Sequence, residues 1–266
     1  MAGIGSKRLS EIYGSFMQID NTTTGIDTTT RAIKDGNGTS SALSSSTNKF
    51  QVTPQASDAT DSVKFTDKDG NSLFVVDTTN DKVKAGIGQI AVNTQYAYFG
   101  IACGISSGWA ANKHYALPFA GNNHSTTIQD DFDFGTGTDP ATTFTTAAAT
   151  ATHSALLVPV MWFVPDNIVI DGVYSIEGAD TATGDTTRMH LYSYTFTSGS
   201  TSALSDGTLL AYNSDVSNAG SEQAYLSTWT VSTPDVSANK VIVAFFRSDS
   251  INSDYSLNVT VKYHIK

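Results

Sequence analysis

The sequence predicts a mainly β fold, and three observations support that prediction. Ser and Thr account for 31 and 36 of the 266 residues, and 10% of the residues are aromatic, whereas only 15% are charged. Thr, Val, Tyr and Phe suit a pleated, half-buried surface, while strong helix formers are few. Short runs that alternate between apolar and polar residues recur between turn sequences rich in Gly, Asp and Asn. These features indicate antiparallel strands joined by tight turns.

Composition divides the chain into three segments. Residues 1–33 read as an N-terminal anchor and linker, residues 34–90 as a small intertwined β collar or shaft, and residues 91–266 as an antiparallel, jelly-roll-like β-sandwich. Charge supports the last boundary, because residues 91–266 hold 6 bases and 15 acids, against 9 and 10 before it. All three Trp residues also lie in the last segment, which has enough aromatic side chains for its own core.

The N-terminal segment carries one apolar stripe. Its members recur at spacings of three and four residues, which is typical of one face of a helix: Leu9, Ile12, Tyr13, Phe16 and Met17. A short isolated helix is marginal in water, so the stripe needs a partner surface. We expect an anchoring peptide that docks on another protein, and a mobile tail is the alternative.

The collar segment consists of short strands and turns. Asp35-Gly36 and Asn37-Gly38 are hairpin signals. Alternating strands are expected at residues 49–53, 62–66, 72–77 and 82–88. Such a small meander holds few large apolar residues and cannot bury much surface alone. Intertwined copies would remove that difficulty, so we expect a homotrimer.

The C-terminal segment contains eight strand candidates separated by turns. They are residues 96–101, 154–164, 168–177, 187–196, 208–212, 224–231, 240–246 and 255–265. The last candidate alternates most clearly, with Tyr255, Leu257, Val259, Val261, Tyr263 and Ile265 expected on one face. A long loop, rich in Thr, Ala and Asp, is expected at residues 122–152.

Several classes of protein are excluded by the sequence. No apolar run approaches the roughly 18 residues of a transmembrane helix, and the first residues lack the apolar run of a secretory signal peptide. The single Cys, Cys103, cannot form an internal disulfide or a Cys-based metal site. The net charge of −10 argues against binding duplex nucleic acid through its phosphates. We therefore expect neither membrane insertion nor a nucleic-acid partner.

Carboxylates and His residues do not form a catalytic pattern. The Asp67-Lys68-Asp69-Gly70 sequence departs from an EF-hand loop and reads as a hairpin turn. Asp130, Asp131 and Asp133 form the densest acidic cluster, which is either a solvated loop or a Ca²⁺ site. The five His residues are scattered without metal-ligand or triad spacing. We expect no catalytic residue, no metal and no cofactor, and therefore not an enzyme.

Surface aromatics of the C-terminal segment are the candidates for binding sugars. Trp109, Tyr115 and Tyr212 are the expected glycan contacts, and Tyr192, Tyr194 and Trp229 are further candidates. Packing in a core or an interface is the alternative for each of these rings.

Three segments carry a family resemblance. They are VKFTDKDGNSLFVVDTTNDKVKAGIG (63–88), KDGNGTSSALSSSTNKFQVTP (34–54) and DVSANKVIVAFFRSDSINSDYSLNVTVKYHIK (235–266). The first resembles a segment common in fibre and spike proteins of tailed bacteriophages, where a short hairpin ends in a Val-Asp-Thr-Thr-Asn-Asp-like turn. The second is similar to the collar that precedes it in such chains. The third is similar to the closing strands of β-sandwich tips on phage head fibres and related appendages.

The resemblance implies a non-enzymatic structural protein of a tailed phage virion, made in the host cytoplasm. It implies a homotrimer that is anchored to the capsid, or to other virion proteins, by its N-terminus and displays a β-sandwich tip for adhesion to a host-surface glycan. The chain is short and has no repeated shaft, which favours a capsid fibre or head decoration. A tail fibre or tail-tip receptor-binding protein is the first alternative. A polysaccharide depolymerase or carbohydrate-binding module is the alternative of a different class.

Overall fold

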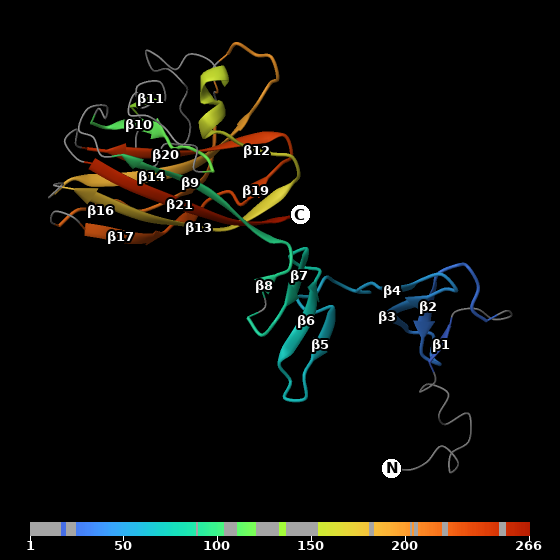
Figure 1. Cartoon of the computed structure of the whole chain (residues 1–266). Coiled ribbons are helices and arrows are strands. Elements are labelled where there is room, and N and C mark those ends of the chain that lie inside the picture. Colours follow the sequence, from blue (N-terminus) through green and yellow to red (C-terminus); the bar gives the residue numbers. More distant parts are fainter. Residues whose placement is uncertain are drawn as a thin grey trace. The chain divides into compact units, whose positions relative to one another are not determined.

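The computed structural model shows an almost entirely β chain with antiparallel sheets (Figure 1). It describes residues 17–19, 25–88, 90–103, 111–120, 133–136, 154–180, 184–202, 204, 207–219, 223–249 and 254–266. The chain divides into two compact units, Met1–Val92 and Asn93–Lys266. This division lies close to the boundary expected after residue 90. In the described part of the chain, no helix is long and apolar enough to cross a membrane.

The first sheet of the N-terminal unit has four strands in sequential order. They are β1 (Gln18–Ile19), β2 (Arg31–Lys34), β3 (Ser40–Ser45) and β4 (Phe50–Val52). The predicted turn between β2 and β3 is present, since Asp35 Oδ1 accepts hydrogen bonds from the backbone N–H groups of Asn37 and Thr39. Gly38 completes the turn at φ +87°, which glycine adopts without a steric penalty. β2 crosses the boundary placed after residue 33, so ordered sheet begins earlier than expected.

The second sheet of this unit is also sequential. It contains β5 (Val63–Thr66), β6 (Ser72–Asp77), β7 (Lys82–Ala85) and β8 (Ile90–Ala91). Between β5 and β6, Asp67 Oδ1 accepts from the backbone N–H groups of Asp69 and Asn71, and Gly70 takes φ +86°. The carboxylate is thus bonded within the turn, which is how a hairpin sequence of this type behaves.

The C-terminal unit contains two antiparallel sheets. The five-stranded sheet has the order β17-β13-β21-β9, with β19 beside β13. Its strands are β9 (Thr94–Cys103), β13 (Ile168–Asp180), β17 (Gln223–Thr228), β19 (Asp235–Val236) and β21 (Asp254–Ile265). The eight-stranded sheet has the order β11-β10-β20-β14-β15-β18, with β12 beside β20 and β16 beside β14. Its strands are β10 (Lys113–Ala116), β11 (Asp133–Thr136), β12 (Trp162–Val164), β14 (Thr186–Thr195), β15 (Thr208–Tyr212), β16 (Val216–Ser217), β18 (Thr230–Val231) and β20 (Lys240–Ser248).

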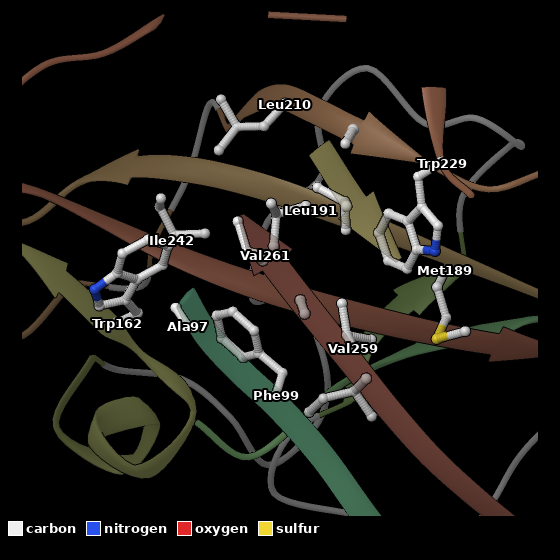
Figure 2. Close-up of a cluster of buried hydrophobic side chains, with 14 of the residues drawn as sticks. Ala97, Phe99, Trp162, Met189, Leu191, Leu210, Trp229, Ile242, Val259 and Val261 are labelled. Carbon is white, nitrogen blue, oxygen red and sulfur yellow. The ribbon is translucent and has the colours of Figure 1, made fainter. Parts of the chain in front are cut away.

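The main core lies between these two sheets. Phe99, Val259 and Val261 enter it from the five-stranded sheet, while Met189 and Leu191 enter it from the eight-stranded sheet, as Figure 2 shows. All five are nearly or fully removed from solvent. Apolar side chains that alternate along each strand therefore meet in the middle of two stacked sheets, as in a β-sandwich.

A second apolar cluster lies on the other face of the eight-stranded sheet. Along β20, Val241, Val243 and Phe245 point into it, while the residues between them point into the main core. The 3₁₀ segment η4 (Ser154–Val160) contributes Leu157 and Val160, both fully buried. β20 is therefore covered on both faces, which explains its unbroken apolar sequence.

The strand expected at residues 154–164 is wrong in its first part. Residues 154–160 form η4, and only β12 follows as a strand. Pro159 lies inside η4, and proline is disfavoured in a central strand because it has no N–H to donate. Leu157 and Val160 are three residues apart and share one side, as the three-residue repeat of a 3₁₀ helix requires.

Candidate functional site

The β5–β8 sheet has one face that is entirely apolar. Strand register aligns Phe65 with Phe74, Ala85 and Ile90, and it aligns Val63 with Val76 and Val83. The rings of Phe65 and Phe74 pack with centroids 5.8 Å apart. Phe65 is nevertheless 60% exposed and Ile90 is 56% exposed. An apolar sheet face must be buried against another layer to stabilise a fold, so this face is a candidate assembly surface.

The opposite face of the same sheet carries the charges. There Asp77 is buried and accepts a hydrogen bond from Lys84 Nζ at 2.5 Å and another from the backbone N–H of Asn80 at 3.0 Å. Burial alone would raise the pKa of Asp77, but the hydrogen bonds from Lys84 and Asn80 outweigh it and hold the pKa below its usual value. The charged face is thus satisfied within the chain, in contrast to the apolar face.

The outward face of the five-stranded sheet presents exposed tyrosines. Tyr96 and Tyr98 on β9 are 49% and 50% exposed, and Tyr174 on β13 is 38% exposed. Register places Thr260 of β21 between Tyr98 and Tyr174 in one row across the sheet. Lys262 is aligned with Tyr96 in the next row. This group of rings and polar side chains is the candidate binding surface of the C-terminal unit.

Of the glycan contacts expected from the sequence, Tyr115 and Tyr212 lie outside this group of tyrosines. Tyr115 is only 3% exposed and belongs to the main core, so its ring cannot offer a face to a sugar. The expectation that Tyr115 contacts a glycan is therefore wrong. Tyr192, Tyr194 and Trp229 are also buried, so they pack in the interior of this unit and do not face a ligand. Tyr212 is partly buried at the end of β15. Trp109 lies outside the described residues.

The expected N-terminal anchor also falls largely outside the described part of the chain. Leu9, Ile12, Tyr13 and Phe16 are not among the described residues. Met17 is described and is 64% exposed, immediately before β1. The anchor stays a prediction.

The most perturbed carboxyl group is Glu177, which lies between the two sheets of the C-terminal unit. It accepts a hydrogen bond from Thr187 Oγ1 at 2.6 Å and lies 3.5 Å from Asn213 Nδ2. Burial raises the pKa of Glu177 to about 7, and the bond from Thr187 opposes this only in part. A raised pKa suits a general acid, but Glu177 is only 3% exposed and has no access to a substrate. We interpret it as a structural group.

Two His contacts could not be found from sequence spacing. The rings of His114 and His190 lie with centroids 5.2 Å apart on the eight-stranded sheet, although 75 residues separate them in the chain. His264 Nδ1 lies 2.9 Å from Asp171 Oδ2. All three His side chains are fully buried, which favours a packing role.

Metal binding has no support in the described part of the chain. No group of three or more His, Cys, Asp or Glu residues there could hold a metal ion. Asp130 and Asp131 lie outside the described residues, and Asp133 begins β11, aligned with Tyr115.

A pocket of about 480 Å³ lies beside η4 and β12. Its described lining is mostly apolar, and Val158, Met161, Phe163 and Phe196 provide much of it. Ser198 supplies a hydroxyl group, but no carboxylate, His or Lys lines the pocket among the described residues. This composition does not form a catalytic pair.

No protein-family model matches the chain, and no curated protein is significantly similar to it.

Proposed function

We propose that this chain is a non-enzymatic structural protein of a tailed phage virion, a short trimeric fibre or head decoration. The observation that carries the proposal is the open apolar face of the β5–β8 sheet. Residues 63–88, which resemble phage fibre segments, form most of this sheet. A fibre collar buries such a face by packing copies of itself around an axis, and the resemblance implies three copies.

In this proposal the two units of the chain have different roles. The N-terminal unit associates and anchors, with Leu9, Ile12, Tyr13, Phe16 and Met17 as the proposed capsid contact. The C-terminal unit has its own core between two sheets and serves as the adhesive tip. Three anchors on one trimer add avidity without new contacts in each chain.

Association is tested with a matched pair of substitutions on one strand. Phe65→Ser removes a ring from the apolar face, while Lys64→Ser changes the neighbouring residue, which points to the other side. Sedimentation equilibrium of the full chain should give a trimer for the wild type and for Lys64→Ser. Phe65→Ser should raise the dissociation constant strongly, because each of the three chains loses a buried ring. A wild-type chain that sediments as a folded monomer at micromolar concentration would refute the trimer.

The virion location is tested on intact particles. Cryo-electron microscopy should place the trimer on the capsid, and density on the tail would instead support the tail-fibre alternative. Phe16→Asp should lower the copy number on particles and leave the far-UV spectrum unchanged. Particles that carry the variant at normal copy number would show that the anchor lies elsewhere.

A further inference from the structure

We propose that the outward face of the five-stranded sheet binds a linear polysaccharide through Tyr96, Tyr98 and Tyr174. This inference rests on the adhesive role proposed above for the C-terminal unit, and it names the ligand class and the residues. These three tyrosines are exposed to solvent, whereas Tyr115, the sugar contact expected from the sequence, lies in the core.

The first argument is the position of the Tyr174 ring. Gly172 precedes it by two residues on the same face of β13. A Cβ atom on Gly172 would lie 2.9 Å from the Tyr174 hydroxyl oxygen and 3.3 Å from its Cε2. The ring therefore leans along the strand and occupies the space above the glycine. The ring therefore lies close to the surface of the sheet, and 38% of the residue is exposed. This position suits stacking of a flat ligand on the ring.

The second argument is the spacing of the rings. Tyr96 and Tyr98 are two residues apart on β9, a distance of roughly 6.7 Å along the strand. Tyr174 lies two strands away, across β21, which corresponds to about 9.6 Å. The first distance runs along the strand and the second across the sheet, so the three rings lie at the corners of a patch that is wide enough for several pyranose units of one chain. A single small molecule would reach only one or two of the rings.

The third argument is the polar strand between the rings. The outward residues of β21 are Ser256, Asn258, Thr260 and Lys262, and the first two are exposed. Their hydroxyl, amide and ammonium groups can exchange hydrogen bonds with sugar hydroxyls beside each stacked ring.

The same strand argues against a second copy of this chain as the occupant. A stable protein interface has an apolar centre and a polar rim. Here the polar column of β21 runs between Tyr96 and Tyr98 on one side and Tyr174 on the other, and the exposed Ile176 and Leu226 lie beyond it on β13 and β17. The centre of the face is therefore polar. The β5–β8 sheet, whose face is apolar throughout, is the better self-association surface.

The experiment uses the full chain on an array of immobilised polysaccharides that includes β-1,4-glucan, α-1,4-glucan, β-1,4-mannan and chitin oligosaccharides. Binding to at least one linear polysaccharide is expected. Tyr98→Ala and Tyr174→Ala should each weaken it about tenfold, the loss of one aromatic contact. Gly172→Ala should also weaken it, because the new Cβ displaces the Tyr174 ring without removing it. Phe163→Ala is the matched control, since it removes a 51% exposed ring from the eight-stranded sheet and should leave binding unchanged.

Three results would overturn the proposal: no polysaccharide bound, binding unaffected by both tyrosine substitutions, or a trimer that dissociates when Tyr98 is replaced. The last result would show that a second copy covers this face. Sedimentation on the same samples separates the two proposals. A monomer that binds polysaccharide through these tyrosines would refute the trimeric fibre and leave the sugar surface standing.

Discussion

Glu177 shows how one side chain can link the stability of the C-terminal unit to pH. Its pKa is raised by burial from 4.5 to about 7. Between these values the folded chain holds a proton that the unfolded chain has released. The contribution of Glu177 to stability is therefore highest below about pH 4.5, falls as the pH rises toward 7, and then levels off.

Glu177→Gln should remove this pH dependence. The neutral amide has nearly the same shape, so the variant should gain on the order of 3 kcal/mol over the wild type at about pH 8 and little at pH 4.5. Urea unfolding followed by Trp fluorescence measures the effect in this unit alone, because all three Trp residues lie in it. A slope that persists in Glu177→Gln would assign the pH dependence to other groups.

The buried pair of Trp229 and Ser175 gives a second prediction for a single residue. Trp229, between β17 and β18, donates a hydrogen bond from Nε1 to Ser175 Oγ on β13 at 2.9 Å. Ser175→Ala leaves the indole N–H without an acceptor in a buried site, which should cost about 1–3 kcal/mol in the free energy of unfolding. Ser256→Ala, on the exposed side of β21, is the control and should change it little. Equal effects of the two substitutions would mean that the bond contributes nothing.

At the scale of elements, the turn after β6 is stabilised by a buried carboxylate. Asp77 receives hydrogen bonds from Lys84 and Asn80, and its pKa is lowered by them. Its contribution to stability is present above the ordinary pKa of 3.8 and is lost as the pH falls through the lowered value.

Asp77→Ala should therefore loosen the β6–β7 hairpin by about 1–2 kcal/mol, since Lys84, whose side chain is 25% exposed, and the Asn80 backbone N–H lose their acceptor. Hydrogen exchange measured by mass spectrometry should show faster exchange in the peptide that spans residues 72–85. Asp69→Ala in the exposed turn before β6 is the control. Unchanged protection in Asp77→Ala would show that packing alone holds the hairpin.

The elements also show where sequence reasoning succeeds and where it fails. β21 follows its predicted alternation over Tyr255, Leu257, Val259 and Val261, because one face is buried and the other meets solvent. Near its end His264 is buried although it points outward, since the strand β13 inserts Asp171 as a bulge and brings its carboxylate to the ring. Such a bulge depends on the partner strand and leaves no local signal.

Contacts between residues that lie far apart in the sequence are the hardest to predict from it. β10 was not expected because Lys113–Ala116 is too short to show a period, yet it places Tyr115 in the core. The tyrosine surface was missed for a related reason. Tyr96 and Tyr98 alternate visibly in the sequence, but only the register with β21 and β13 brings Tyr174 into the same group.

At the scale of the whole molecule, the two units should differ in how they respond to protein concentration. The proposed trimer buries the apolar face of β5–β8, so the unfolding of that unit is coupled to dissociation, and its midpoint must rise with protomer concentration. The C-terminal unit has two stacked sheets and a closed core, so its unfolding needs no partner. Calorimetry of the full chain should therefore show two transitions, of which one shifts with concentration.

Two variants assign the transitions. Phe65→Ser should lower only the concentration-dependent midpoint, because the ring lies on the association surface. A chain that begins at Asn93 should keep the other transition, remain rich in strand and fail to join particles. If the shortened chain unfolds with a concentration-dependent midpoint of its own, the C-terminal unit also takes part in association. The apolar face of β5–β8 would then be one contact of the trimer among several, and Phe65→Ser should weaken the assembly without separating it.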